Sequence, residues 1–293
     1  MRAATPDCAP SAVAAITAPP VGLTPLLRHT DTQCAPRAIP SRYRHMRPLR
    51  VTCSVLLCLI VACGTPEASS DRVVVVATDA TYQPFEYLGD GRVIVGYDID
   101  LFRAIGERAG FAVEFVNQPF VGALAGLETG AYQAMISAMT ITEERAETFL
   151  FSDPYYDAGQ VVAIRDETDD IASFADLPGR KIGVQRGTTG SMKAKEAPGA
   201  ELTEYDTIDL AFMALGNGTV DAVINDEPTS RSIAAARGGF RLVGETLTEE
   251  QYGIAMRRDA HELAAKINAA LAELRADGTL DRLRARWIDA AGE

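Results

Sequence analysis

The sequence predicts an α/β fold, and two observations carry that prediction. Continuous apolar runs, such as residues 72–78 and 220–224, are typical of strands buried in a parallel sheet. Segments with helical periodicity and capping signals alternate with these runs, as they do in βαβ units. At 293 residues the chain is long enough for two compact domains, and two such series follow one another along it.

The first series ends near residue 155. Its expected elements are a strand at 72–78, a helix capped by Asp98 or Asp100 and closed by Gly110, a strand at 112–116, a helix begun by Pro119, and a strand at 134–136 followed by a capped helix. The second series has expected strands at 160–164, 181–184, 201–205, 220–224 and 241–244, and helices after the glycine loop 185–190, at 208–215 and at 230–237. Two amphipathic helices, 260–276 and 279–288, are expected to end the chain.

Residues 1–71 are expected to lie outside the folded body. Residues 1–45 have no sustained periodicity and indicate a disordered or mis-annotated extension. Residues 46–62 combine arginines with eleven apolar residues, too few to span a bilayer, as in a secretory signal. Small residues before Cys63 resemble the lipobox of bacterial lipoproteins, which implies that Cys63 carries lipid, palmitate included. A plain signal peptide is the alternative, and residues 63–71 are expected to form a tether.

Charge and residue usage exclude several function classes. The net charge is −12, and residues 1–62 hold seven Arg and two Asp, so the remainder has 21 basic against 38 acidic residues. Such an acidic body is a poor partner for nucleic acid. All five cysteines lie within the first 63 residues, and His261 is the only histidine after them. We therefore expect neither a metal site, a disulfide nor a Ser-His-Asp triad in the body, and no cofactor.

Residues 134–156 carry the strongest sign of a binding site. A short apolar strand ends in Ser137 and Thr140, and Arg145 follows one turn into the next helix. Thr140 is expected to start a capping box, with Thr142 as a second possible cap. A strand end with hydroxyls and a nearby guanidinium suits a carboxylate, because the Arg fork can bind it bidentately. A solvated Arg on an ordinary surface helix explains the same spacing.

Several motifs together resemble one family over residues 73–293. The matching pieces are VATDATYQPFEY (76–87), GYDIDLFRAI (96–105), MTITEERAETFLFSDPYY (139–156), KIGVQRGTTGS (181–191) and VDAVINDEP (220–228), in the family's order. They resemble the periplasmic solute-binding proteins of polar amino-acid ABC importers, especially the glutamine-binding kind, here in lipoprotein form. The resemblance implies two lobes, each a mostly parallel sheet flanked by helices, joined by two hinge strands, with the ligand bound between them.

The resemblance also implies boundaries and roles. Lobe 1 would comprise residues 72–155 and 253–293, and lobe 2 residues 160–248, with hinges near 156–160 and 248–252. Arg145 would bind the α-carboxylate of an amino acid, helped by Thr140, the Ala138 backbone and the loop with Thr188 and Thr189. Asp226 would bind its ammonium, and Tyr82 and Phe120 would sandwich it. The implied ligand-binding residues are Asp79, Tyr82, Phe120, Ser137, Ala138, Thr140, Arg145, Gln185, Thr188, Thr189, Asn225 and Asp226. The implied function is capture of an amino acid outside the cytoplasm by a lipid-anchored monomer, which delivers it to an ABC permease in the membrane by lobe closure.

Departures from the family pattern leave the ligand open. Gln185 and Asn225 stand where glutamine binders have Lys and His, so glutamine is no better a candidate than arginine, lysine or histidine. Asp79, and Glu86 less directly, could pair with a cationic side chain. Asp79 could equally be a strand-end cap, and Gln185 an ordinary surface amide.

Three other functions remain open on the same fold. The chain could be a ligand-sensing lipoprotein that acts through a partner receptor. It could resemble the cyclohexadienyl dehydratases, in which case Glu86 or Glu227 would have to be the general acid. It could also be an α/β protein with no small ligand. We expect a binding protein and not an enzyme.

Overall fold

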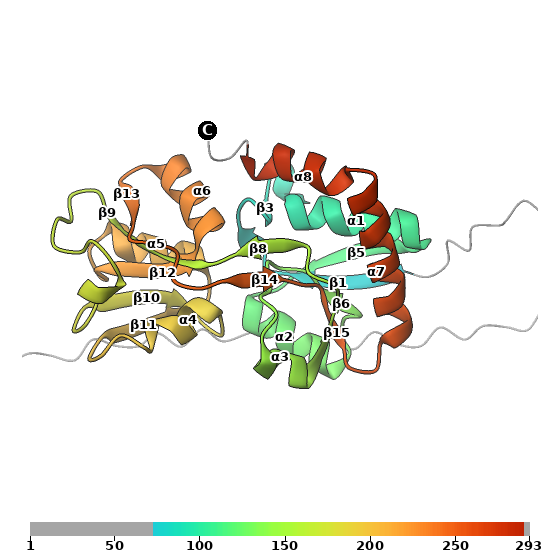
Figure 1. Cartoon of the computed structure of the whole chain (residues 1–293), viewed down its shortest axis with the longest axis horizontal. Coiled ribbons are helices and arrows are strands. Elements are labelled where there is room, and N and C mark those ends of the chain that lie inside the picture. Colours follow the sequence, from blue (N-terminus) through green and yellow to red (C-terminus); the bar gives the residue numbers. More distant parts are fainter. Residues whose placement is uncertain (1–72, 290–293) are drawn as a thin grey trace, which may run out of the picture. The chain divides into compact units, whose positions relative to one another are not determined.

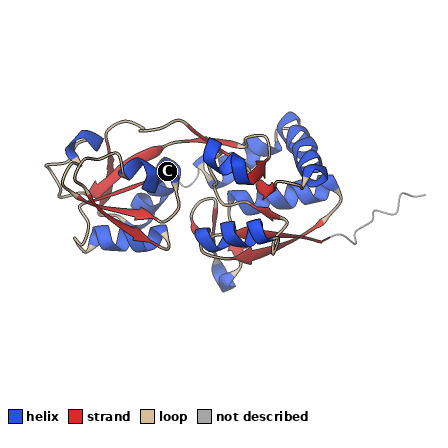
Figure 2. Ribbon diagram, turned by 90° about the horizontal axis from the view of Figure 1, so that it is seen from below, coloured by secondary structure: helices blue, strands red, loops and turns tan. Residues whose placement is uncertain are grey.

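The computed structural model describes residues 73–289, so the extension, signal peptide, Cys63 and tether expected from the sequence lie outside the described residues. Two five-stranded sheets form the framework (Figures 1 and 2). The first has the order β5-β1-β6-β15-β7, with β1 (Val73–Thr78), β5 (Ala112–Asn117), β6 (Ala134–Met135), β7 (Phe149–Phe151) and β15 (Ala255–Arg257). The second has the order β11-β10-β12-β9-β13, with β9 (Gln160–Arg165), β10 (Lys181–Gln185), β11 (Glu201–Tyr205), β12 (Ala222–Asp226) and β13 (Phe240–Val243).

Helices pack on each sheet and define two lobes. The first lobe contains the first sheet with α1 (Tyr97–Ala109), α2 (Phe120–Thr129), α3 (Glu143–Thr148), α7 (His261–Ala276) and α8 (Thr279–Trp287), and a small sheet of β2 (Thr81–Tyr82), β3 (Glu86–Leu88) and β4 (Ile94–Val95). The second lobe contains the second sheet with α4 (Thr189–Ala194), α5 (Ile208–Gly216) and α6 (Glu227–Arg237). Short 3-10 turns lie at Asp90–Arg92 and Phe174–Asp176.

A two-stranded ribbon connects the lobes. It consists of β8 (Tyr156–Ala158) and β14 (Glu250–Tyr252), which pair antiparallel and run between the two sheets in Figure 1. We call it the hinge ribbon. The chain passes through it once into the second lobe and once back.

Each sheet is mostly parallel, as expected, because four of its five strands run in one direction and a single strand runs against them. β1 pairs in parallel with β5 and β6, whereas β15 is antiparallel to β6 and β7. The second sheet repeats this arrangement, because β10 is parallel to β11 and β12 and β9 is antiparallel to β12 and β13. The hinge ribbon is the physical reason that one strand of each sheet is reversed. β9 and β15 enter their sheets from the ribbon, at the edge where the parallel strands end, and therefore run in the opposite direction.

The start of α1 differs from the prediction that Asp98 or Asp100 caps it. The helix begins at Tyr97 after Gly96, whose φ is 136°. A Cβ at this position would lie 2.1 Å from the carbonyl oxygen of Phe85, so only glycine fits between β3 and the helix. Asp98 is instead fully buried and accepts a hydrogen bond from the Ala138 backbone. The predicted inner face of the helix, with Leu101, Phe102 and Ile105, is completely buried against α7.

The capping prediction for α3 is wrong at Thr140 and right at Thr142. Thr142 precedes the helix, and its side chain accepts a hydrogen bond from the Arg145 backbone N–H. Thr140 lies two residues earlier and forms a bridge with Tyr252 of the hinge ribbon. The α3 helix therefore starts later than the capping box would place it, and Thr140 faces the region between the lobes.

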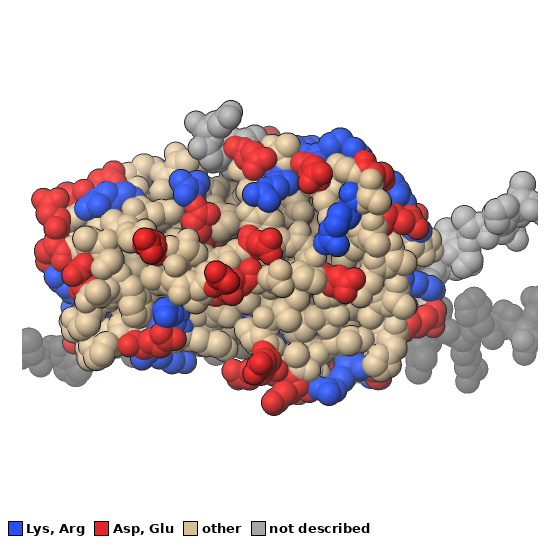
Figure 3. All heavy atoms as spheres, in the orientation of Figure 1, with Lys and Arg blue, Asp and Glu red and all other residues tan. Residues whose placement is uncertain are grey.

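The surface charge and the helices of residues 73–289 show two further features. Lys and Arg side chains on the face drawn in Figure 3 are scattered among Asp and Glu and form no continuous basic surface. None of the described helices combines the length and apolar character that crossing a bilayer requires.

Candidate functional site

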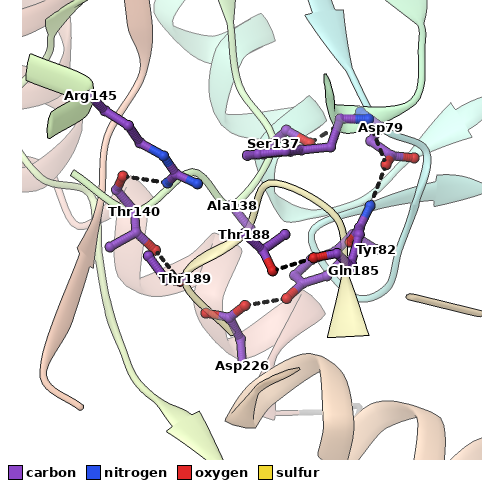
Figure 4. Close-up of a pocket in the computed structure, with 11 residues that line it drawn as sticks. Asp79, Tyr82, Ser137, Ala138, Thr140, Arg145, Gln185, Thr188, Thr189 and Asp226 are labelled. Atoms are coloured by element: carbon purple, nitrogen blue, oxygen red, sulfur yellow. Dashed lines mark hydrogen bonds between the residues drawn. The ribbon is translucent and has the colours of Figure 1, made fainter. Parts of the chain in front are cut away.

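A cavity between the lobes brings together eleven of the twelve predicted ligand-binding residues (Figure 4). The cavity is narrow, with about 20 Å³ accessible to the centre of a water-sized sphere. Its lining residues are Asp79, Tyr82, Phe120, Ser137, Ala138, Thr140, Arg145, Gln185, Thr188, Thr189 and Asp226. The twelfth, Asn225, lies behind the wall, where its amide nitrogen is 3.3 Å from Ser230 Oγ and its oxygen 2.7 Å from the Tyr82 hydroxyl. These residues come from both lobes, and their contacts with a ligand stay predictions.

Arg145 lies at one end of the cavity and is buried. Its Nη1 donates to the carbonyl oxygen of Thr140 at 2.7 Å, and its Nη2 donates to the carbonyl oxygen of Gly187, on the second lobe, at 3.0 Å. The guanidinium carbon is 5.3 Å from the centre of the Phe120 ring. Burial lowers the pKa of Arg145, and the nearby carboxylates Asp226 and Glu250 oppose this effect. A guanidinium has five N–H donors, so two carbonyl contacts leave donors for a ligand carboxylate.

Asp79 directly follows β1 and faces the cavity from the first lobe. Its Oδ2 accepts hydrogen bonds from the Phe120 backbone N–H at 3.1 Å and from the Gln185 side chain at 2.8 Å. Its Oδ1 accepts from Thr81 at 2.9 Å. Asp79 thus accepts the first backbone N–H of α2 and lines the cavity, and its pairing with a cationic ligand side chain stays a prediction. Burial raises the pKa of its carboxyl group, and the three hydrogen bonds counteract that rise.

Asp226 ends β12 and faces the same cavity from the second lobe. It receives the hydroxyl of Tyr82, which comes from the first lobe, and the Gln160 amide nitrogen at 3.0 Å. Burial, reinforced by the negative charge of Glu250, raises the pKa of Asp226 to about 6. Its carboxylate therefore gains from any cation that enters the cavity. The Tyr82 hydroxyl supplies a hydrogen bond but no positive charge.

The glycine loop of the second lobe closes one side of the cavity. Gly187 has a φ of 77°, and Thr188 then caps α4 by accepting a hydrogen bond from the Ser191 backbone. The Thr188 hydroxyl donates to the carbonyl oxygen of Gln185 at 2.8 Å. Gln185 is 2% exposed, so it is a buried cavity residue and not a surface amide.

A second layer of buried acids supports the wall from the first lobe. Ser137 Oγ accepts the Asp79 backbone N–H at 3.1 Å and donates to Glu86 at 2.9 Å. Asp98 accepts from the Ala138 backbone and from the Tyr155 hydroxyl, each at 2.8 Å. Glu86 Oε2 and Asp98 Oδ1 are buried without a donor, and each acid contributes to the pKa shift of the other, so a proton held between them would satisfy both oxygens.

The two glutamates considered as general acids, Glu86 and Glu227, lie outside the cavity. Burial, together with the charge of Asp98, raises the pKa of Glu86 well above its ordinary value, and burial raises the pKa of Asp98 to about 6. Glu86 lies behind the wall, where Ser137 separates it from the cavity, and Glu227 bonds to Arg231 on α6 at 2.6 Å. Neither glutamate lines the cavity, so neither is placed to contact a bound molecule.

Two residues of the site were not predicted from the sequence. Gln160, the first residue of β9, donates its amide nitrogen to Asp226 and to Thr189, at 3.0 and 3.1 Å. Glu250, in the hinge ribbon, accepts the hydroxyls of Thr140 and Thr189 at 2.6 and 2.9 Å. Their only signal in the sequence was that both lie in segments expected to join the lobes. No group of three or more His, Cys, Asp or Glu within residues 73–289 is arranged to hold a metal ion.

Comparisons with known proteins agree with this geometry. Residues 74–290 match the family model of bacterial extracellular solute-binding proteins, family 3. The ABC transporter arginine-binding protein 1 of Escherichia coli K12 is 34% identical over 240 residues, which cover 80% of this chain and 98% of that protein. The histidine-binding periplasmic protein of Salmonella typhimurium LT2 is 29% identical over 83% of this chain and 98% of its own length.

Solved structures give the same result. An ancestral arginine-binding protein bound to arginine matches with a TM-score of 0.71 and 39% identity, covering 73% of this chain and 97% of that one. An ancestral arginine-binding protein bound to glutamine matches with a TM-score of 0.72 and 39% identity, covering 75% of this chain and 98% of that one. The two-lobed fold and the family model together show that the chain belongs to the bacterial extracellular solute-binding proteins of family 3.

Proposed function

We propose that this protein captures a polar amino acid outside the cytoplasm and delivers it to an ABC importer through lobe closure. The observation that carries the proposal is the placement of Arg145 and Asp226 in one buried cavity, on opposite lobes. A zwitterion taken out of water needs a counter-charge for each of its charges. Arg145 would bind the carboxylate and Asp226 the ammonium, so the ligand would bridge the lobes and favour the closed arrangement.

The charges of the cavity match a basic amino acid best, with glutamine as the alternative. Once Arg145 and Asp226 are matched by a zwitterion, Asp79 is left as a second buried carboxylate facing the cavity. A cationic side chain would supply the charge that the amide of Gln185 cannot. Relatives named as arginine-binding and histidine-binding proteins support this choice. Glutamine stays in the proposal because an ancestral arginine-binding protein has also been solved with it.

The proposal includes the setting of the protein. Lipid on Cys63, palmitate included, would hold a monomer at the membrane, in the periplasm or at the cell surface, next to its permease. No catalytic step or cofactor is part of it. Two buried charges that clamp a zwitterion suffice for capture, and the glutamates considered as general acids, Glu86 and Glu227, do not face the cavity.

A thermal-shift screen tests the proposal. The panel contains arginine, lysine, histidine and glutamine, with leucine and glutamate as mismatched controls and prephenate as a probe for enzyme activity. A ligand at 100 times its Kd stabilises the folded state by about 2.7 kcal/mol, which raises the Tm by several degrees. We expect the largest increase with a basic amino acid. A protein that responds only to prephenate and converts it would contradict the proposal.

A further inference from the structure

Glu250 is a buried carboxylate in the connection between the lobes. It is the first residue of β14 and pairs with Ala158 of β8 in the hinge ribbon. The residue is 9% exposed, although its neighbour Glu249 is exposed. Burying a carboxylate is costly unless donors surround it, so the position of Glu250 calls for an explanation from its partners.

Hydrogen bonds from both lobes converge on one oxygen of Glu250. Oε2 accepts the hydroxyl of Thr140, from the first lobe, at 2.6 Å, and the hydroxyl of Thr189, from the second lobe, at 2.9 Å. The Gln160 amide nitrogen lies 3.4 Å from the same oxygen, and Oε1 accepts from Thr248 at 2.8 Å. Hydrogen bonds to a charged acceptor are about twice as strong as neutral ones.

The two threonines can reach one oxygen only while the lobes are together. Thr140 follows β6 in the first lobe, and Thr189 begins α4 in the second. A hinge motion that separates the lobes moves these hydroxyls apart, so at least one bond to Glu250 must break. Other cross-lobe hydrogen bonds join Tyr82 to Asn225 and Asp226, Gln185 to Asp79, and Arg145 to the Gly187 carbonyl, and each involves a side chain that lines the cavity. Glu250 itself does not line the cavity, although its donors Thr140 and Thr189 do.

We propose that Glu250 is a positioning residue that links both lobes to the hinge ribbon and stabilises their closed arrangement, whichever ligand is bound. A hydroxyl has a single proton. When Thr140 and Thr189 donate theirs to Glu250, their oxygens can only accept hydrogen bonds from a molecule in the cavity. Their side chains would then face an ammonium group more favourably than a carboxylate. This modifies the role first assigned to Thr140, as a helper of Arg145.

Spin-label distances in the full chain test the proposal. Glu107 of α1 and Lys195, just after α4, are exposed and lie in different lobes. Because the chain has five cysteines, the labels are attached to ketone-bearing amino acids introduced at these two positions. The distance distribution is measured with and without arginine in the unsubstituted chain, Glu250→Ala, Glu250→Gln and the matched control Glu249→Ala. Calorimetry gives the Kd for arginine and glutamine in the same proteins.

We expect Glu250→Ala to increase the population with a long distance and to weaken both ligands about tenfold or more. The apparent Kd equals the intrinsic Kd divided by the fraction of molecules able to close, so a smaller fraction raises the apparent Kd. Glu250→Gln keeps an oxygen acceptor for the two hydroxyls and should stay within about threefold of the unsubstituted chain. Glu249→Ala should give the same distances and Kd as the unsubstituted chain. A purely local role in folding would lower the Tm without changing the distances.

Two results would overturn the proposal. One is a folded Glu250→Ala protein with unchanged distances and a Kd within twofold of the unsubstituted chain. The other is an unsubstituted chain that shows only the long distance in every condition. The affinity measurement rests on the proposed function, but the distances of the ligand-free protein do not. A chain that binds no amino acid yet opens in Glu250→Ala would refute the proposed ligand and support the role of Glu250.

Discussion

The two walls of the cavity are built in different ways. In the first lobe the polar groups are held from behind by their own lobe. Ser137 and the Ala138 backbone bond to Glu86 and Asp98, and Asp79 caps α2. Ser137, Ala138 and Asp79 are therefore held by their own lobe, whereas Arg145 and Tyr82 of the same wall also bond to the second lobe.

The second wall shares its side chains with its surroundings. Gln185 donates to Asp79 of the first lobe, and Asp226 receives Tyr82 of the first lobe and Gln160, next to the hinge ribbon. A ligand entering the cavity must replace some of these partners. Its ammonium would compete with the Tyr82 hydroxyl for Asp226, and its side chain would compete with Gln185 for Asp79.

The difference suggests a division of labour. Groups held by their own lobe supply affinity, because little has to rearrange when the ligand binds. A wall whose side chains exchange partners couples ligand binding to closure and sets the choice between ligands. Changes in the first wall should therefore alter affinity or stability strongly, and changes in the second should alter selectivity more mildly.

Arg145→Ala should give the largest effect. It leaves a buried ligand carboxylate without its counter-charge, which costs roughly 2–5 kcal/mol, or on the order of 30- to 5,000-fold in Kd. Calorimetry with arginine measures it. Arg145→Lys should recover only part of the loss, because an ammonium cannot form the two parallel bonds of a guanidinium.

The matched control for this prediction is Arg103→Ala. Arg103 lies on α1 in the same lobe, and its side chain is 47% exposed. Its removal should leave Kd within about twofold, since exposed ion pairs contribute little. An Arg145→Ala protein that is folded and has the Kd of the unsubstituted chain would refute the role of Arg145 as carboxylate ligand.

The acid pair behind the first wall predicts a pH dependence of stability. In the folded state the pKa of each carboxyl group lies above its ordinary value. The pKa of Glu86 is raised well above 4.5, and the pKa of Asp98 is raised from 3.8 to about 6. The folded state therefore binds protons more tightly than the unfolded state. The stability that these groups contribute is complete at low pH. The Asp98 part is lost as the pH rises from about 4 to 6, and the Glu86 part as the pH rises above 4.5 through its raised folded-state pKa.

Glu86→Gln isolates this effect. The amide replaces the protonated acid, can accept from Ser137 and donate to Asp98, and cannot lose a proton. In urea unfolding, the free energy of unfolding of the variant should equal that of the unsubstituted chain near pH 4. Near pH 8 it should be larger by about 1–3 kcal/mol. Glu107→Gln, at an exposed position, controls for the loss of charge. A difference that does not vary with pH would argue against a shared proton.

Much of the fold could be predicted from the sequence because its signals are local. The apolar run of β1 and the predicted face of α1 depend on side chains that are neighbours along the chain. The short strands β7 and β15 were not expected, and β8 and β14 were expected only as the two hinge strands that the family resemblance implies. They are three residues each, and what makes them strands is the pairing partner that the hinge ribbon brings to them.

The residues of the site also differ in whether the sequence predicts them. Asp79, Arg145 and Asp226 could be predicted because each follows or ends a buried strand, where α/β folds place their ligands. Glu250 and the pairing of Glu86 with Asp98 could not. The Thr140 hydroxyl that bonds to Glu250 is 110 residues away in sequence, and the Ala138 amide that bonds to Asp98 is 40 residues away. The role of such a buried acid depends on its tertiary neighbours, whereas a sequence pattern shows only that the residue is acidic.

Gln185→Leu should have the smallest effect and tests the second wall most directly. The Gln185 amide nitrogen donates to Asp79 Oδ2 at 2.8 Å, the same oxygen that a cationic side chain would approach. Leucine has a similar size and no donor, so the substitution leaves Asp79 less compensated. A basic ligand should gain from this and glutamine should not. The ratio of the Kd for glutamine to the Kd for arginine should rise about two- to fivefold, the equivalent of roughly 0.5–1 kcal/mol.

Gln251→Leu is the control, because Gln251 is exposed in the hinge ribbon and donates to Asp157. A Gln185→Leu protein whose ratio falls would mean that the Gln185 amide itself contacts the ligand and that Asp79 is only the cap of α2. Arginine and glutamine would then be distinguished elsewhere in the cavity. A rise would place the selectivity of the protein in the competition between a fixed carboxylate of the first wall and an exchangeable amide of the second.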